Sequence, residues 1–468
     1  MRESKKKRSE KVAEIPPSVL IYSLGCVKNF VDSEIAAASL LTAGFSLTPD
    51  AEEASVIFIN SCAFLASARE ELEEILQSAK RWKKQDPVRK IIVGGCVVPW
   101  DTDNAFRTAH PEVDAWCEIH SVEEIGAITA AAWNGDAIPD QHTDQPYIHS
   151  CRTPRLQMTP QHYAYLKVSD GCDNRCTYCK IPDIRGTLRS RTVADVLQEA
   201  RDLLSSGVKE LIVIAQDTAA FGRDLYGSPR LTELLKELDQ LDDLAPEGYL
   251  VRLMYLHPAS VDDELMDTMN SCKHLVRCIE MPLQHISDRI LKAMHRREGG
   301  ARTREVVRRL NQDFGFAIRT TFMVGFPGET KEDFDELLSY VKEAKFARLG
   351  TFIYSREAGV PAAEMADQVP AAEAKKRLKK LMTAQAAISL AANEALIGTE
   401  VDVIIDELLP RGKALGRMFA DAPEIDNSVL ISGVRKKQHR CGDFVKVVIT
   451  AADEYDIQGT IAERSKAR

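Results

Sequence analysis

The chain has 468 residues, of which 44% are apolar, and its formal net charge is -9. This length exceeds what a single hydrophobic core organises, and the apolar content excludes extensive disorder away from the ends. The negative charge argues against nonspecific binding of nucleic acid, which depends on clustered lysine and arginine. The sequence shows neither a secretory leader nor a run of about 18 apolar residues, so we expect a cytoplasmic protein without a membrane segment.

Short apolar runs alternate with helical patterns in the first part of the chain. The predicted strands are 19–22, 55–59 and 90–93, and the predicted helices are 33–42 and 66–84. This alternation is typical of a parallel α/β sheet and predicts an N-terminal domain over 17–135. The basic residues 1–16 in front of it are expected to form a disordered tail.

Six strand–helix units are predicted in the middle of the chain, after a polar linker at 136–161. The strand-like runs end near Ser169, Ala215, His257, Gln284, Val324 and Tyr354. Helical patterns are found at 192–206, 231–242, 262–271, 287–297, 303–314 and 331–344. Together they predict a partial (βα) barrel within 162–396, with its functional residues in the loops at the carboxyl ends of the strands.

The last part of the chain begins after a long Ala-, Lys- and Leu-rich helix predicted at 371–396. Short alternating runs such as 400–404 and 444–449 are separated by turn residues and predict a small β-barrel over 397–465. The expected fold class is therefore α/β, with an N-terminal parallel α/β domain, a central partial barrel and a C-terminal β-barrel.

Three of the eleven cysteines share one short loop. Cys172, Cys176 and Cys179 form a C-x-x-x-C-x-x-C pattern just after a predicted strand. Soft thiolates at this spacing suit an iron–sulfur cluster, and three of them leave one iron without a protein ligand, a position that suits S-adenosylmethionine (SAM). The alternative is a zinc knuckle, but structural zinc sites normally close with four ligands, and no fourth Cys or His lies at zinc-ribbon spacing nearby.

A second set of cysteines follows the three N-terminal strands. Cys26, Cys62 and Cys96 each come after one strand, and the carboxyl ends of parallel strands lie on the same side of a sheet. From the residues alone, buried core thiols are the simpler interpretation. The shared placement of the three cysteines after successive strands reduces the preference for core thiols over a common metal site. The remaining cysteines are assigned to packing: Cys117, Cys151, Cys272, Cys278 and Cys441.

The cluster loop resembles that of the radical SAM superfamily, in which an aromatic residue, here Tyr178, precedes the last cysteine. Over nearly its whole length the chain resembles the methylthiotransferases of that superfamily, whose terminal barrel is similar to the TRAM module. The motifs that carry this resemblance are 170–179, 184–186, 215–218, 281–285, 324–330 and 422–426. It implies SAM and two 4Fe-4S clusters as cofactors, the first cluster bound by Cys172, Cys176 and Cys179 and the auxiliary cluster by Cys26, Cys62 and Cys96.

The resemblance also implies which residues contact SAM at the carboxyl ends of the barrel strands. The expected contacts are Tyr178, Gln216, Asp217, Gln284, His285, Val324, Gly325, Phe326 and Tyr354. For His285 the alternative is a satisfied core histidine, and for Gly325 it is a residue required only by its turn. No side chain is assigned as a catalytic acid or base, because the clusters and SAM would carry the chemistry.

The nearest branch of this family methylthiolates the β-carbon of an aspartate in ribosomal protein S-twelve. It implies a protein of the small ribosomal subunit as substrate, a reductant such as flavodoxin or ferredoxin, and a sulfur donor. Between Gly398 and Glu463 there are twelve acidic and eight basic residues, which favours a basic protein over RNA as the partner.

Two alternatives belong to other classes of function. The first is the tRNA-modifying branch of the same family. The basic tract 435–440 is compatible with contact with RNA. The second is a noncatalytic iron–sulfur factor that binds the ribosome. The complete set of motifs at the strand ends argues against the second alternative, because a carrier does not need them.

Overall fold

The structure, a computed structural model, describes residues 16–141 and 147–462. The described chain divides into two compact units, one made of 16–63, 67–141 and 153–156, the other of 64–66, 147–152 and 157–462. Of the tail predicted at 1–16, only Pro16 lies within the described residues. Among the helices that the structure describes, none has the length and apolar character required to cross a membrane.

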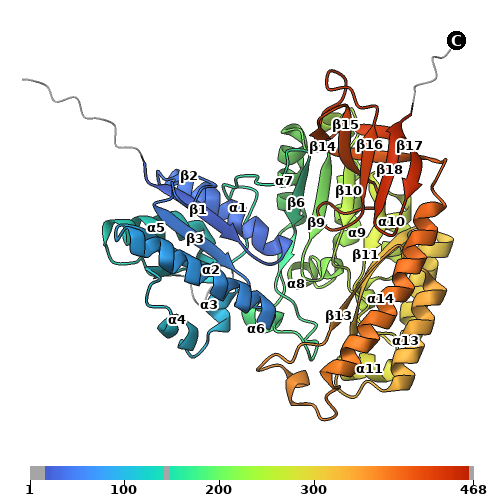
Figure 1. Cartoon of the computed structure of the whole chain (residues 1–468), viewed down its shortest axis with the longest axis horizontal. Coiled ribbons are helices and arrows are strands. Elements are labelled where there is room, and N and C mark those ends of the chain that lie inside the picture. Colours follow the sequence, from blue (N-terminus) through green and yellow to red (C-terminus); the bar gives the residue numbers. More distant parts are fainter. Residues whose placement is uncertain (1–15, 142–146, 463–468) are drawn as a thin grey trace, which may run out of the picture. The chain divides into compact units, whose positions relative to one another are not determined.

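A five-stranded parallel sheet with the strand order β2-β1-β3-β4-β5 forms the centre of the first unit (Figure 1). The strands are β1 (Ser18–Ser23), β2 (Ser46–Leu47), β3 (Val56–Ser61), β4 (Lys90–Gly95) and β5 (Ala115–Trp116). The helices are α1 (Val27–Thr42), α2 (Ala66–Gln85), α3 (Val97–Trp100), α4 (Ala105–Ala109) and α5 (Ile125–Asn134), with a 3-10 turn at Ile119–Glu124. The parallel α/β sheet predicted from the sequence is confirmed, and β2 and β5 were missed because two residues carry no periodicity.

Helix α2 shows why the sequence pattern was informative in this unit. Its buried residues are Leu72, Leu76, Ala79 and Trp82, which recur at helical spacing on one face, while the rest of the helix is charged and polar. The central strand β3 is instead buried along its entire length, as expected for a strand of a parallel sheet covered on both faces.

The second unit contains the six predicted parallel strands in the order β13-β12-β11-β10-β9-β6, so the sheet stays open between β13 and β6. The strands are β6 (Tyr163–Lys167), β9 (Glu210–Ile214), β10 (Leu250–Leu253), β11 (Leu275–Glu280), β12 (Ala317–Val324) and β13 (Arg348–Ile353). The longer helices are α7 (Val193–Ser205), α9 (Leu231–Leu238), α10 (Asp263–Ser271), α12 (Gly300–Arg308), α13 (Lys331–Ala344) and α14 (Ala371–Glu394). Shorter elements are β7 (Ser169–Asp170), α6 (Ile181–Arg185), β8 (Arg189–Ser190), α8 (Arg223–Tyr226) and α11 (Asp288–Ala293).

Two of these strands end earlier than the apolar pattern predicts. β10 ends at Leu253 and not near His257, and β11 ends at Glu280 and not near Gln284. Tyr255 and Gln284 have φ values of 64° and 67°, which an extended strand does not allow. The early ends leave both residues in loops at the carboxyl edge of the sheet, where non-glycine residues in this conformation often mark functional positions.

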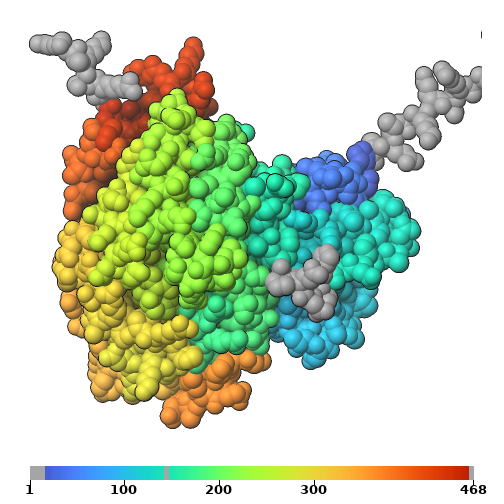
Figure 2. All heavy atoms as spheres, turned by 180° about the vertical axis from the view of Figure 1, so that it is seen from behind, coloured from blue at the N-terminus to red at the C-terminus, as the bar shows by residue number. Residues whose placement is uncertain are grey.

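A closed five-stranded barrel with the order β14-β15-β16-β18-β17 forms the end of the described chain. Its strands are β14 (Glu400–Leu409), β15 (Lys413–Met418), β16 (Ser428–Ser432), β17 (Phe444–Ala452) and β18 (Asp456–Ile461). Apolar residues such as Val403, Ile431 and Val447 alternate into its core. Figures 1 and 2 both show this barrel (red) against the strands and helices of the same unit.

A buried carboxylate joins the closed barrel to the six-stranded sheet. Glu210 starts β9, has no exposed surface, and lies 2.6 Å from the Arg252 guanidinium and 2.5 Å from that of Arg417 in β15. Removing one partner from a buried, charged cluster of this kind typically costs about 3–5 kcal/mol, because the others stay desolvated. The position of the barrel on the sheet is therefore set by charge pairing.

The β15–β16 loop adds further pairs to the same interface. Asp426 lies 3.0 Å from Arg319 in β12, and Asp421 accepts a hydrogen bond of 2.7 Å from Arg348 in β13. Glu424 accepts a hydrogen bond of 2.7 Å from the Tyr163 hydroxyl. These acidic residues are engaged within the unit, so the net charge of the barrel sequence says little about the charge that it presents to a partner.

Asp421 makes this interface sensitive to pH. Burial raises its pKa to about 6, and the nearby Asp426 adds to the effect, although Arg348 opposes it. Between the ordinary carboxyl pKa and about 6, the folded protein binds a proton that the unfolded chain does not, so stability falls as the pH rises through this interval.

We therefore expect Asp421→Asn to gain about 1.4 kcal/mol of stability relative to the wild type when the pH is raised from 5 to 8, because about one pH unit separates pH 5 from the raised pKa of about 6. Thermal unfolding of both proteins at the two pH values measures this difference. Asp406→Asn, at a partly exposed interface position, serves as the control. If the stability difference between Asp421→Asn and the wild type is the same at pH 5 and at pH 8, the pKa of the Asp421 carboxyl is not raised.

Candidate iron–sulfur and SAM site

The cysteine loop of the second unit is held by backbone hydrogen bonds. The N–H of Cys172 donates to Gly186 O at 3.1 Å, and that of Cys179 donates to Cys176 O at 3.0 Å. Gly171 has a φ of 77°, and a Cβ there would lie 2.0 Å from Thr187 O, so no other residue fits at the start of the loop.

The three thiols of this loop share a largely buried environment. Burial raises the pKa of Cys172 to about 11 and that of Cys179 to about 12, and neighbouring cysteines contribute to both shifts. These two thiols are therefore protonated at neutral pH, and iron must displace the protons when it binds. Soft sulfur donors gathered in one largely buried loop fit an iron–sulfur cluster.

A zinc knuckle, the alternative, requires a different arrangement of the thiols. A zinc ion needs its ligands around a single point, whereas in a 4Fe-4S cluster each thiolate binds a different iron. Within 16–141 and 147–462, no group of three or more His, Cys, Asp or Glu side chains converges on a position for one metal ion.

A buried carboxylate fixes the loop to the sheet. Asp170 accepts hydrogen bonds from Gln216 Nε2 at 2.7 Å and from Gly171 N at 2.9 Å, and lies 3.1 Å from the Arg185 guanidinium and 3.4 Å from Lys167 Nζ. Burial by itself would raise the pKa of Asp170, but Arg185 and Lys167 hold it well below its usual value. Arg185 is itself buried, and its guanidinium is paired with Asp170 inside the protein.

Gln216 and Asp217, two predicted SAM contacts, present buried acceptors at the end of β9. Gln216 Oε1 and Asp217 Oδ1 have no hydrogen-bond partner among the described residues. Asp217 Oδ2 accepts hydrogen bonds from Asn174 of the cysteine loop at 2.9 Å and from Ser260 at 3.2 Å. Burial raises the pKa of Asp217. Two unpaired acceptors beside the cysteine loop fit a cationic donor such as the amino group of SAM.

Three predicted aromatic contacts form one row. The rings of Tyr178 and Phe326 lie 6.4 Å apart, and those of Phe326 and Tyr354 lie 5.4 Å apart, both edge to face. Arg296, which the sequence gave no reason to select, donates a hydrogen bond of 3.3 Å to the Tyr178 hydroxyl. The row connects the cysteine loop to the ends of β12 and β13.

The carboxylate of Glu329 fixes the loop after β12. It accepts a hydrogen bond from Gly325 N and lies 3.2 Å from the Arg377 guanidinium of α14. His285 has no exposed surface, and its Nε2 lies 3.8 Å from Glu329 Oε1. The imidazole Nδ1 accepts a hydrogen bond of 3.0 Å from Ser287 N, whereas its Nε2 has no hydrogen-bond partner among the described residues. Glu329 lies in a motif noted in the sequence, but nothing there indicated its pairing with Arg377.

The backbones of Gln284 and Val324 are engaged within the protein. Gln284 N donates to Thr321 O at 2.8 Å, and its carbonyl accepts from Met323 N at 2.7 Å. The Val324 side chain is fully buried, and its carbonyl accepts from Tyr354 N at 2.9 Å. The structure places both residues at the carboxyl edge of the sheet, and their contact with SAM stays a prediction.

In the first unit, backbone packing brings the loops of Cys26, Cys62 and Cys96 together. Gly25 has a φ of 84°, and a Cβ there would lie 2.8 Å from the Cys62 Sγ. The N–H of Cys96 donates to Ser61 O at 3.0 Å, directly before Cys62. The three cysteines therefore follow neighbouring strands β1, β3 and β4 at one edge of the sheet, a placement that fits a second cluster.

Buried polar side chains fix these loops to one another. Asn29 Nδ2 donates to Leu24 O at 2.8 Å and to the carbonyls of Asn60 and Ser61 at 3.2 Å. Asn60 Nδ2 returns a hydrogen bond of 2.8 Å to Asn29 O. Both asparagines stand in the motifs around the cysteines, but their roles depend on contacts between distant segments and were not predicted.

The other cysteines separate into two groups. Cys117, Cys272 and Cys278 are buried, as expected for packing. Cys441 is exposed, so assigning it to packing was wrong, whereas Cys151 is half-buried and its packing role stays a prediction. Cys441 belongs to the turn between β16 and β17, where polar neighbours and solvent replace a core.

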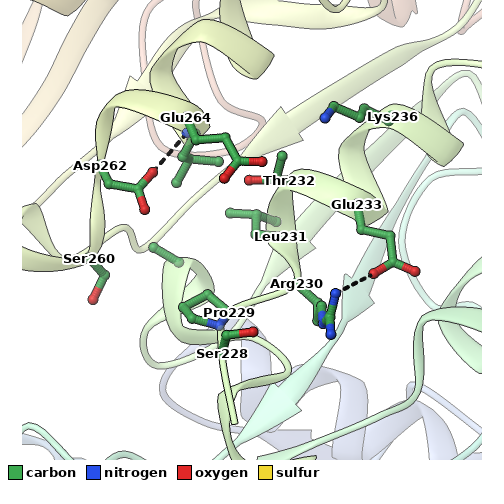
Figure 3. A pocket seen from close by; sticks show the side chains of 12 residues that line it. Ser228, Pro229, Arg230, Leu231, Thr232, Glu233, Lys236, Ser260, Asp262 and Glu264 are labelled. Atoms are coloured by element: carbon green, nitrogen blue, oxygen red, sulfur yellow. Dashed lines mark hydrogen bonds and ion pairs between the residues drawn. The ribbon is translucent and has the colours of Figure 1, made fainter. Parts of the chain in front are cut away.

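A cavity of about 410 Å³ lies near this edge of the sheet, between the first turns of α9 and α10 (Figure 3). Its lining includes Arg230, Glu233, Lys236 and Glu264, which alternate in charge. Ser260, one of its lining residues, donates a hydrogen bond of 3.2 Å to Asp217 Oδ2. None of the cysteines is among the residues that line the cavity.

Comparisons with known proteins agree with this geometry. Residues 166–341 match the radical SAM superfamily, 18–118 match uncharacterized protein family UPF0004, and 397–462 match the TRAM domain. Among solved structures, the radical SAM methyltransferase TsrM of Kitasatospora setae has a TM-score of 0.53 at 16% identity and covers 74% of this chain and 76% of its own. The cobalamin-dependent SAM radical enzyme OxsB has a TM-score of 0.50 at 14% identity, covering 79% and 56%.

The chain is thus defined as a radical SAM protein with a C-terminal TRAM domain. Ribosomal protein uS12 methylthiotransferase RimO of Desulforamulus reducens is 39% identical over 96% of this chain and 100% of its own length. The protein of the same name from Anaeromyxobacter sp. (strain K) is 40% identical, over 96% and 94%. This chain belongs to the RimO methylthiotransferase family.

We expect Gly95→Ala to disrupt the second cysteine set selectively. Gly95 has a φ of 85°, and a Cβ there would lie 2.4 Å from Asn60 Oδ1 and 2.7 Å from Ser61 N. The substitution should reduce the iron content after anaerobic reconstitution by about half, because one of two four-iron clusters is lost. Gly44→Ala is the matched control, since Gly44 has a φ of 90° but a methyl group there would meet no atom within 4 Å. Equal iron content in both variants would contradict the assignment.

Proposed function

We propose that this chain methylthiolates the β-carbon of an aspartate in ribosomal protein uS12. The observation that carries the proposal is the pair of three-cysteine sets, each at the carboxyl edge of a parallel sheet, in a chain that matches RimO relatives almost from end to end. A noncatalytic iron–sulfur factor has no need for the unpaired acceptors of Gln216 and Asp217 beside the first set.

In this proposal the two units bind different cofactors. Residues 17–135 hold the auxiliary cluster through Cys26, Cys62 and Cys96. Residues 162–396 hold the first cluster through Cys172, Cys176 and Cys179 and bind SAM, and 397–465 form the TRAM-like barrel. A reductant such as flavodoxin or ferredoxin and a sulfur donor complete the system, and a ribosomal substrate implies activity in the cytoplasm.

The residues around the first cysteine set position the cofactor. Gln216 Oε1 and Asp217 Oδ1 accept from the amino group of SAM, and the aromatic row of Tyr178, Phe326 and Tyr354 supplies apolar walls. Bound there, the cluster and SAM supply the radical chemistry that an unactivated C–H bond requires, because no side chain of ordinary pKa removes such a hydrogen. The burial of these groups excludes water from the site.

The test is to incubate the anaerobically reconstituted protein with reductant, SAM and sulfide in the presence of either uS12 or tRNA. Mass spectrometry should find a methylthio group on the aspartate of uS12. Cys172→Ala should abolish formation of 5′-deoxyadenosine, whereas Cys26→Ala should retain it and lose sulfur insertion. Sulfur transfer by the Cys26 variant would overturn the role of the auxiliary set.

One observation favours the tRNA alternative, so the experiment must offer tRNA as well as uS12. Six exposed basic residues stand on two turns of the closed barrel: Arg411, Lys413, Arg435, Lys436, Lys437 and Arg440. Val434 N donates to Gly412 O at 3.0 Å, so the two turns lie side by side. A methylthio group found on tRNA and not on uS12 would replace the proposed substrate.

A further inference from the structure

Strand β13 is an edge strand of the six-stranded sheet. It pairs with β12 along its whole length and, within the described residues, with no other strand. Tyr354 N donates to Val324 O at 2.9 Å. The backbone N–H and C=O groups of Tyr354, Phe352 and Gly350 therefore face β12, because backbone groups alternate in direction along a strand. Those of Leu349, Thr351 and Ile353 therefore face away from the sheet.

Proteins usually guard such an edge with a charge, a proline or a bulge. Residues 349–353 contain no charge and no proline, and their register with β12 has no irregularity. An edge of this kind is a template for an added strand.

The two faces of β13 differ sharply. Leu349 and Ile353 pack into the core beneath the helices. On the opposite face, Phe352 is 59% exposed, and a Cβ on Gly350 would meet no atom within 4 Å. An exposed aromatic ring beside open space gives an incoming chain a surface for its side chains.

The edge leads to the candidate active site. β13 ends one residue before Tyr354, whose ring packs on Phe326, and Phe326 packs on Tyr178 of the cysteine loop. A strand added to β13 would continue from Phe352 along this aromatic row. The position of the edge therefore fits a segment of substrate and not a distant partner.

We propose that β13 binds an extended segment of the protein substrate as an added β-strand, with a substrate side chain on Phe352, and so delivers the target residue to the cluster. This inference rests on the proposed function, since it requires a protein substrate. Main-chain hydrogen bonds to Leu349, Thr351 and Ile353 supply affinity, and the open face next to Gly350 admits the alternate side chains of the segment.

Thr351→Pro tests the proposal sharply. The Thr351 N–H faces the free edge, so proline removes a donor to the substrate while the hydrogen bonds to β12 remain. We expect the KM for uS12 to rise about 10-fold, the equivalent of one lost hydrogen bond, with little change in 5′-deoxyadenosine formation without substrate. Phe352→Ser should raise the KM similarly, and Thr351→Ser, which keeps the backbone N–H at the same position, is the matched control.

A second measurement does not depend on the folding of any variant. Synthetic substrate peptides are N-methylated at one backbone position at a time and offered to the wild-type protein. Loss of modification at alternate positions is the signature of a paired strand. Unchanged KM values for Thr351→Pro and Phe352→Ser, or no alternation in the peptide series, would overturn the edge proposal while uS12 modification by the wild type stands. If the wild type forms 5′-deoxyadenosine but leaves uS12 unmodified, the proposed function fails and the edge proposal falls with it.

Discussion

The buried carboxylate of Asp170 is the contact on which the candidate site depends. It joins the last strand residues before the cysteine loop to Gln216 at the end of the next strand, and it balances Arg185 and Lys167 in a region without solvent. A buried charge is tolerable only when it is paired and hydrogen-bonded, so these residues must stay together. The thiols and the acceptors of Gln216 and Asp217 are thereby held at one edge of the sheet.

The first unit achieves the same result without charge. Its three cysteine loops are joined by the amides of Asn29 and Asn60 and by close packing at Gly25 and Gly95. Neutral amides cost less to bury than charged groups, and both asparagines donate to backbone carbonyls. Two different polar networks thus each hold a set of three thiols at the carboxyl edge of a parallel sheet.

The closed barrel shows how an intramolecular interface changes the meaning of a charge count. Asp421, Glu424 and Asp426 neutralise or bind groups of the six-stranded sheet, and Arg417 pairs with Glu210. The exposed charged residues at 411–413 and 435–440 are all basic. The acidic balance of the barrel sequence therefore reflects its attachment to the sheet more than its choice of partner.

The sequence by itself determined the three-part architecture, the order of the strands along the chain and the two cysteine sets, because periodicity and cysteine spacing are local properties. It also placed Gln216, Asp217 and the aromatic residues at strand ends. Tertiary structure alone decided the rest: the support of the β12 loop by Glu329, the pairing of Arg185, the exposure of Cys441 and the free edge of β13. Each of these depends on segments that are distant in sequence, and burial and pairing are settled only when the chain folds.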